Sequence, residues 1–175
     1  MKKEYKFILA IDPSGNFNEG KGTTGWCIFN TDESKVTIAS SISSKKYSDM
    51  ELYWWAHLLL IEKYHEKYKD NFIVVLEDYL LYESKMKSQI NSRMETPKII
   101  GIIQLYCFMH SIPIILQSAS LVKNRWNNDI LLYKHYLYKK GKNLCLQDKT
   151  ILDRHAIDSV RHAVHYATFK NKGDR

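Results

Sequence analysis

The chain has 175 residues, of which 45% are hydrophobic and 13% are aromatic. That is enough to bury one core and too little for two ordinary domains, so we expect residues 1–175 to form a single domain. Lys and Arg number 26 against 19 Asp and Glu, and the resulting net charge of +7 favours a polyanionic partner. Three separated cysteines exclude a disulfide framework and a CxxC metal site, and no apolar run is long enough to cross a membrane. The expected setting is the reducing cytoplasm.

The first half of the chain predicts three strands, a helix and a fourth strand. Strands are expected at residues 5–11, 23–29 and 36–42, separated by turn-forming residues. Apolar residues at helical spacing, with charges between them, predict an amphipathic helix over residues 50–68. The residues that carry this pattern are Leu52, Trp55, Leu58, Leu59 and Tyr64. Residues 72–76 are wholly apolar, which is typical of a strand buried in a parallel sheet.

The second half predicts helices around a fifth strand. Residues 79–95 are polar, basic and aromatic without a clean period, so we expect a loop there. Helices are expected from residue 96 or 97 to 110, from residue 121 onward, and from Asp153, as the N-cap, to residue 169. A strand is expected at residues 111–116. This order predicts an α/β fold with a central five-stranded mixed sheet, three strands antiparallel and two parallel, flanked by helices.

Two acidic residues close strands that this order places side by side and parallel. They are Asp12 and Glu77. Because the carboxyl ends of parallel strands meet at one edge of a sheet, we expect the two carboxylates to converge. Ionised carboxylates held close together repel each other, and a divalent cation relieves that repulsion. Oxygen ligands favour Mg²⁺ or Mn²⁺, which also bind phosphate oxygens. Each acid taken alone is more simply explained as a turn residue at a strand end.

The last helix carries His155 and Asp158, one turn apart. At that spacing an imidazole and a carboxylate can address one ion or one water molecule. Together with His162 and His165 they lie opposite an apolar stripe at intervals of three and four residues. For His162 and His165 the simpler interpretation is a solvated helix face. A zinc site made of these histidines lacks a Cys partner or an HExxH pattern.

Basic residues interleaved with aromatic rings predict a surface for nucleic acid, because cations contact phosphates and rings stack on exposed bases. The candidate DNA-binding residues are Lys85, Lys87, Arg93, Lys98, Lys123, Arg125, Tyr79 and Tyr82. Further lysines and tyrosines alternate over residues 133–142. The alternative for the lysines is a solvated surface that keeps the protein soluble.

Four pieces of the chain occur in the order ILAIDPS…TTGWCIF, IVVLEDYL, IIGIIQLYCFMHSIPIILQSASLVKNRW and HAIDSVRHAV. Together they resemble the RuvC family of Holliday junction resolvases, which has the RNase H-like fold, across nearly the whole chain. By position, Asp12, Glu77 and Asp158 match the acidic catalytic residues of the family, and His155 stands where many members have a fourth Asp. Ser14 replaces a family glycine, and the insertion NFNEGK follows it. These departures resemble the phage-encoded branch.

The resemblance implies a DNA endonuclease, in a bacterium or a phage-infected cell, that resolves Holliday junctions by paired symmetric nicks. Asp12, Glu77, His155 and Asp158 are then the catalytic and metal-ligating residues. The hypothesis places two Mg²⁺ or Mn²⁺ ions roughly 4 Å apart, bridged by Asp12, with Glu77 on one ion and Asp158 with His155 on the other. Tyr82 stands near the place where the family has an aromatic that wedges into the junction. No nucleotide cofactor and no membrane contact are expected.

The resemblance also implies a homodimer. The helix expected over residues 97–110 is the candidate interface, because a two-fold contact needs one self-complementary surface. Its apolar residues are Ile99, Ile102, Ile103, Tyr106 and Met109. Burial of the same residues against the sheet is the alternative.

Three other functions stay open on the sequence. A debranching or packaging nuclease of the same fold would keep the acidic residues and differ only in its substrate. An actin-like ATP-binding module would share the first hairpin, whose Gly, Ser and Thr residues can hold a phosphate, but it needs a second phosphate loop. A non-catalytic junction-binding protein would keep the basic surface without needing acids at three positions on the sheet edge.

Overall fold

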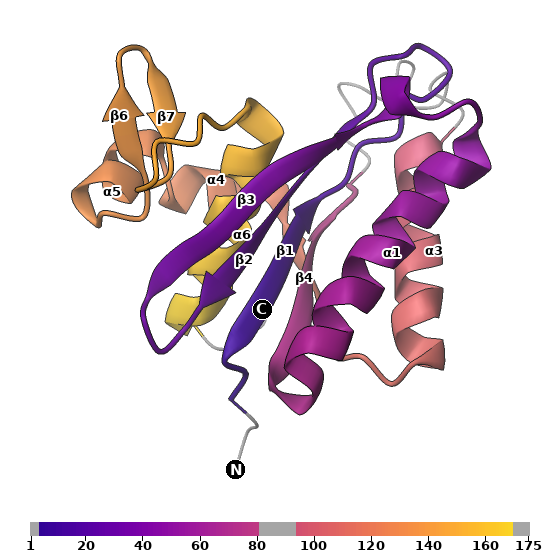
Figure 1. Cartoon of the computed structure of the whole chain (residues 1–175), viewed down its shortest axis with the longest axis horizontal. Coiled ribbons are helices and arrows are strands. Elements are labelled where there is room, and N and C mark those ends of the chain that lie inside the picture. The colour runs from indigo at the N-terminus through magenta and orange to yellow at the C-terminus, as the bar shows by residue number, and fades with distance from the viewer. Residues whose placement is uncertain (1–3, 81–93, 170–175) are drawn as a thin grey trace.

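The structure is a computed structural model that describes residues 4–80 and 94–169 (Figure 1). Its strands are β1 Phe7–Asp12, β2 Thr23–Asn30, β3 Lys35–Ser43, β4 Phe72–Asp78, β5 Ile114–Ser118, β6 Tyr138–Lys140 and β7 Asn143–Cys145. Its helices are η1 Ser44–Lys46, α1 Met50–Tyr68, η2 Lys69–Asn71, α3 Glu95–Met109, α4 Ala119–Arg125, α5 Asn128–Tyr133 and α6 Arg154–Phe169. None of these described helices is long and apolar enough to cross a membrane.

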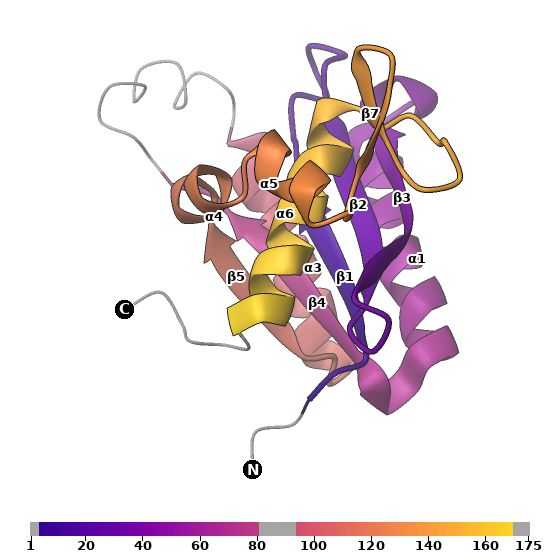
Figure 2. The same cartoon turned by 90° about the vertical axis from the view of Figure 1, so that its left-hand side faces the viewer.

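Strands β1 to β5 form one sheet in the order β3-β2-β1-β4-β5. β2 is antiparallel to β1 and β3, whereas β4 is parallel to β1 and β5. Helices α1 and α3 cover one face of the sheet, and α4, α5 and α6 lie on the other face (Figures 1 and 2). The predicted five-stranded mixed sheet flanked by helices is confirmed.

The central strands are apolar throughout because both of their faces are covered. Ile8 and Ala10 of β1 belong to the cluster packed against α6, whereas Leu9 and Ile11 belong to the cluster under α1 and α3. This alternation follows from the two-residue period of a strand. Residues 72–76 of β4 are buried in the same way. Two hydrophobic cores, one on each face, therefore hold β1 and β4 together at the centre of the molecule.

The buried side of α1 differs from the predicted one. It runs through Tyr53, His57 and Ile61. Three residues of the predicted apolar pattern are instead exposed, and these are Leu52, Trp55 and Leu59. The physical reason is hydrogen bonding, because the Tyr53 hydroxyl and the His57 ring both contact the Thr24 hydroxyl of β2. A pattern of hydrophobic residues does not predict hydrogen bonds between buried polar side chains.

The predicted dimer helix is also partly misassigned. Ile99 and Ile103 of α3 are buried under the sheet and cannot meet a second chain. The exposed apolar residues of α3 are Leu105, Phe108 and Met109. A helix that packs on a sheet buries one stripe, and in α3 that stripe takes Ile99 and Ile103, whereas Met109 of the expected interface stays exposed.

Two segments of the second half differ from their predicted form. The fifth strand begins at Ile114 rather than at residue 111. The helix expected from residue 121 is divided into α4 and α5, because the side chain of Asn127 accepts from the Ile130 N–H and starts a new helix. A hairpin, β6–β7, follows and was not expected.

The start of α6 agrees with the prediction. The side chain of Asp153 accepts from the Ala156 N–H, which confirms the predicted N-cap of this helix.

α6 crosses directly over β2 at Gly25. A Cβ atom on this glycine would lie 2.0 Å from the carbonyl carbon of His155 and 2.4 Å from the Ala156 nitrogen. Gly25 is also the β2 residue that pairs with Asp12. The missing side chain at Gly25 therefore lets the first turn of α6 approach the end of β1.

We predict that Gly25→Ala lowers the free energy of unfolding by at least about 2 kcal/mol, because the new methyl group collides with backbone atoms of α6. Gly101→Ala on the exposed side of α3 is the matched control, since nothing lies within 4 Å of its added Cβ. There we expect a gain of about 0.5–1 kcal/mol from helix propensity. Urea unfolding of both variants checks this, and equal stability of the two would contradict the close approach.

Candidate active site

β1 and β4 end at the same edge of the sheet. Their parallel register makes Asp12 and Glu77 neighbours. The first two turns of α6 lie beside this edge and add His155 and Asp158. The structure thus brings all four predicted catalytic residues to one pocket.

The carboxylate of Asp12 is almost completely buried. Only 4% of its surface is exposed, and its Oδ2 lies 2.8 Å from Nδ1 of His155. Burial raises the pKa of the Asp12 carboxyl to about 6; the hydrogen bond with His155 opposes that shift, and the charges of Glu77 and Asp158 add to it. The same hydrogen bond raises the pKa of His155. A cation beside Asp12 would relieve this electrostatic cost.

Glu77 is held in place by His162. His162 is fully buried, and its Nε2 lies 2.8 Å from Oε2 of Glu77. Its Nδ1 lies 2.9 Å from Oε1 of Gln117, the β5 residue that pairs with Glu77. Burial raises the pKa of the Glu77 carboxyl, but hydrogen bonding and charge from His162 and Lys123 outweigh burial and hold this pKa at about 2. Glu77 is therefore ionised at neutral pH.

Asp158 lies between two basic side chains. Lys123 Nζ is 3.0 Å from Oδ2 of Asp158 and 3.1 Å from Oε2 of Glu77, and Arg161 donates to Oδ1 of Asp158. Burial lowers the pKa of Lys123, but Glu77, Asp12 and Asp158 outweigh it, so the net shift is upward. The ammonium group of Lys123 lies between the carboxylates of Glu77 and Asp158, and their negative charges favour a positive charge at this position.

A buried network fixes the loop that follows Asp12. The Ser14 N–H donates to Oγ1 of Thr24 at 3.1 Å, and the Tyr53 hydroxyl donates to the Ser14 carbonyl at 2.7 Å. Nδ1 of His57 lies 2.7 Å from the Tyr53 carbonyl and must donate to it, so Nε2 accepts from the Thr24 hydroxyl at 2.8 Å. Burial lowers the pKa of His57 to about 4. His57 is therefore neutral at pH 7, as this arrangement requires.

The start of α3 holds the other side of the same loop. The buried carboxylate of Glu95 accepts from the Phe17 N–H and from the side-chain amide of Asn18. Oγ1 of Thr96 accepts from the Gly15 N–H at 2.9 Å. The insertion that distinguishes this loop is thus tied to α3, and Thr96 reaches the pocket wall.

The pocket has a volume of about 330 Å³. Its walls are formed by Asp12, Pro13, Ser14, Glu77, Asp78, Tyr79, Thr96, Ile100, Lys123, Arg154, His155 and Asp158. Carboxylates with one imidazole are a donor set that fits a hard divalent cation. In the described part of the chain no three Asp, Glu, His or Cys side chains converge on one point. Lys123, Arg161 and the histidines take up the carboxylate oxygens instead.

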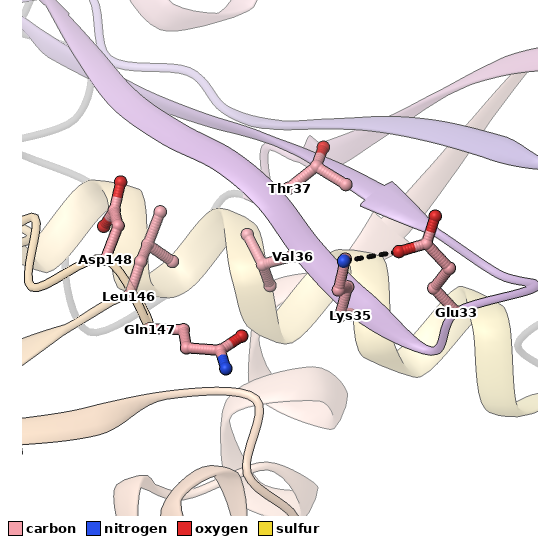
Figure 3. Close-up of a pocket in the computed structure, with 7 residues that line it drawn as sticks. All are labelled: Glu33, Lys35, Val36, Thr37, Leu146, Gln147 and Asp148. Atoms are coloured by element: carbon pink, nitrogen blue, oxygen red, sulfur yellow. Dashed lines mark ion pairs between the residues drawn. The ribbon is translucent and has the colours of Figure 1, made fainter.

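A second hollow, of about 420 Å³, lies between β3 and residues 146–148 (Figure 3). Two of its charged side chains, Glu33 and Lys35, form an ion pair with each other. Asp148 is the other acidic residue that lines it. This hollow is lined by two acidic residues, one of them paired with Lys35, whereas four acidic residues line the first pocket.

The structure corrects the interpretation of His162 and His165 as a solvated face. They are 0% and 6% exposed. α6 packs against β1 and β2 on one side and against α4 on another, so more than one stripe of the helix is buried. The Trp126 indole N–H donates to Nδ1 of His165 at 3.3 Å. The one sequence signal for His162 is its position four residues after Asp158, on the same side of the helix.

The candidate DNA-binding residues are dispersed. Lys123 belongs to the acidic centre, and Tyr79 lines the same pocket. Lys98 is exposed on α3. Arg125 lies 4.0 Å from the ring centre of Phe169, at the far end of α6 and roughly 20 Å along that helix from the acids. Four candidates lie outside the described residues, and these are Tyr82, Lys85, Lys87 and Arg93.

Comparison with known proteins identifies the architecture. No protein-family model and no curated protein matches the chain. Among solved structures, RuvC from Thermus thermophilus in complex with a Holliday junction substrate matches with a TM-score of 0.68 and 12% identity, over 97% of each chain. A second structure of Thermus thermophilus RuvC matches with a TM-score of 0.62 and 11% identity, over 94% of this chain and 95% of the other. The chain has the RuvC fold. The predicted RNase H-like architecture is thereby confirmed over nearly the whole chain.

We predict that Asp12→Asn stabilises this RuvC-like chain by about 2 kcal/mol at pH 7 in EDTA. A raised pKa means that the folded state disfavours the ionised carboxylate, and the neutral amide avoids that cost while it can still accept from His155. The gain should fade as the pH falls from about 6 towards 4, because Asp12 of the wild type then takes up a proton. Urea unfolding across this pH range measures it.

Asp70→Asn is the control for that measurement. Asp70 is exposed in η2, so its substitution should change the stability by less than about 0.5 kcal/mol at any pH in the range. A less stable Asp12→Asn protein at pH 7 would show that the carboxylate is not electrostatically disfavoured in the folded state.

Proposed function

We propose that this protein is a divalent-metal-dependent endonuclease that resolves four-way DNA junctions by paired symmetric nicks. One observation carries the proposal. Asp12, Glu77 and Asp158 come from three distant parts of the sequence and line one pocket of a chain with the RuvC fold. A fold that served only as a scaffold would gain nothing from bringing three acids to one pocket, because their negative charges repel one another.

The reaction is hydrolysis of a phosphodiester. The oxygen of a water molecule bonds to phosphorus, the bond to the 3′ oxygen breaks, and the products are a 5′ phosphate and a 3′ hydroxyl. Two Mg²⁺ or Mn²⁺ ions bound by Asp12, Glu77, Asp158 and His155 would supply the Lewis-acid activation of the water and of the leaving oxygen. The residues themselves set the geometry, since Lys123 bridges Glu77 and Asp158, and His155 is oriented by its hydrogen bond to Asp12.

Lys123 and Arg154 are the basic residues on the pocket wall, and we assign them to the phosphate. Lys123 now neutralises Glu77 and Asp158. When cations bind to these acids, the ammonium group is released to contact a phosphate oxygen. Tyr79 on the same wall offers a ring to an unstacked base. Lys98 and Arg125 lie outside this pocket and would contact more distant parts of the DNA.

A homodimer through α3 belongs to the same proposal, because paired nicks on opposed strands need two active sites. Leu105, Phe108 and Met109 are 59%, 83% and 70% exposed, and they lie close together on the last turns of the helix. Large exposed apolar residues grouped in this way mark a protein–protein contact more often than a bare surface. A two-fold axis beside Phe108 would pair this patch with itself.

The test is cleavage of a labelled four-way junction and of a matched linear duplex, with Mg²⁺, with Mn²⁺ and with EDTA. We predict paired nicks in the junction with either metal, none in EDTA, and a loss of at least about a thousandfold in Asp12→Asn. Sedimentation of the same preparation measures the oligomeric state, and a monomer at concentrations that give paired nicks would contradict the dimer.

Other outcomes point to other functions. Equal cutting of flaps, forks and junctions would identify a debranching nuclease with the same acidic residues. Binding without cutting under every metal would mean that the acidic cluster is structural and that the protein only binds junctions.

We predict that His162→Ala lowers the cleavage rate about 10- to 100-fold, because Glu77 loses the donor that orients it. His165→Ala is the matched control, since His165 is buried on the same helix and accepts from the indole N–H of Trp126. The control should lose stability and keep most of its activity. His162→Gln keeps a donor for Glu77 and should recover part of the rate. Equal losses in the two alanine variants would mean that His162 acts only through packing.

A further inference from the structure

Positive charge is concentrated in one short segment of the chain. Residues 134–149, which we call the basic hairpin, comprise β6, β7 and their flanks. They contain five lysines and one aspartate, a net charge of +4 out of +7 for the whole chain. The lysines are Lys134, Lys139, Lys140, Lys142 and Lys149, and all five are exposed. Within the described residues, no carboxylate forms an ion pair with any of them.

The stem of the basic hairpin is anchored in the core. Leu137, Cys145 and Leu146 are buried, and Leu137 and Leu146 join the hydrophobic cluster beneath α6. The chain after β7 pairs back onto it, with the Leu152 N–H donating to the Leu144 carbonyl at 3.0 Å. A hairpin of two three-residue strands is not stable alone, so these contacts are what give it a defined position.

The tip contributes nothing to that core. Residues 139–143 are exposed, and Gly141 has φ +62°, as the first central residue of a type II′ turn requires. Lys140 and Lys142 stand on either side of it. Three lysines within four residues repel one another and bury no apolar surface, so the fold gains no stability from them. These exposed charges are therefore available to a partner outside the protein.

The basic hairpin stands beside the active site. It leads into α6, and only seven residues separate the end of β7 from Asp153, the cap of the helix that carries His155 and Asp158. Figures 1 and 2 show β6 and β7 next to the first turn of α6, projecting from the same end of the molecule as the loop after β1. Arg154 connects the basic hairpin to the active-site pocket, because it is the first residue of α6 and also lines the pocket.

We propose that the basic hairpin is a second DNA-binding element, which contacts the phosphates of a duplex arm as that arm leaves the active-site pocket. The proposal rests on the proposed function, since a nucleic-acid strand in the pocket is what brings a duplex past the hairpin. From Cys145 to Gly141 the hairpin reaches about 13 Å, enough to extend beyond the pocket rim along the arm. Lysines without bidentate geometry contact the backbone and not the bases, so this element adds affinity without sequence preference.

The test compares Lys140→Ala/Lys142→Ala with Lys63→Ala/Lys67→Ala. The second pair removes the same charge from exposed positions in the last turns of α1. The last turns of α1 lie at the opposite end of the molecule from β6 and β7 (Figure 1). Binding of a fluorescent four-way junction is measured in EDTA, where no cleavage occurs, between 50 and 200 mM salt. The hairpin variant should lose roughly tenfold or more in affinity, and the slope of log K against log salt should shrink by about 2, since each phosphate contact contributes about 0.9. The control variant should match the wild type.

The cleavage assay separates the two proposals. At saturating protein the hairpin variant should cleave at the wild-type rate, because Lys140 and Lys142 are remote from the reacting phosphate. A hairpin variant with wild-type affinity and salt slope, or a control that loses as much, overturns the hairpin proposal while leaving the nuclease intact. A wild type that cleaves nothing, yet binds through the hairpin, overturns the nuclease and keeps the hairpin. Because both pairs are on the surface, thermal unfolding midpoints should stay within a few degrees of the wild type.

Discussion

The parallel pairing of β1 with β4 forces two carboxylates, Asp12 and Glu77, to the same edge of the sheet. Helices on both faces bury the apolar strands, and that burial stabilises the pairing. The acids follow as residues at the ends of those strands. The folded state disfavours the charge of Asp12, whose pKa is raised to about 6, and the stability of the two hydrophobic cores offsets that cost. α6 then adds Asp158, a third acid and a buried one, because Gly25 lets the helix lie against β2. The burial of apolar surface in the two cores therefore keeps Asp12 close to Glu77 and Asp158, although the negative charges of these side chains repel one another.

Each acid is stabilised by a different kind of partner. His155 forms a hydrogen bond with Asp12, and the buried His162 forms one with Glu77. Lys123 forms ion pairs with both Glu77 and Asp158. The result is opposite pKa shifts within one pocket, to about 6 for Asp12 and to about 2 for Glu77. Perturbed and opposed ionisation of neighbouring groups is a feature of functional sites. The pocket is acidic overall, and it also contains the basic side chains of Lys123 and Arg154. Further positive charge lies outside the pocket, on the hairpin of residues 134–149.

The two faces of the sheet have different tasks. On the face of α1 and α3, buried polar side chains such as His57 and Glu95 hold the loop after Asp12, and the outer surface is apolar enough to meet another protein. On the face of α6, the charged groups of the site and of the basic hairpin gather. β1 connects the two faces. Its side chains alternate between the two hydrophobic cores, and the strand ends at the pocket, to which elements of both faces contribute.

The sequence by itself predicted the five strands of the main sheet, because continuous apolar runs and turn formers are local features. It also pointed to the four candidate catalytic residues, two as acids at strand ends and two as a pair one turn apart on the last helix. It did not predict β6 and β7. It did not determine which side of a helix is buried when polar groups take part. The buried His57 and His162 depend on Thr24, Gln117 and Glu77, which lie 33 to 85 residues away in the chain. The hairpin of residues 134–149 is stable only against a core that the rest of the chain supplies. Hydrogen-bond partners and packing surfaces distant in sequence were decided by the tertiary structure, since they exist only once the chain has folded.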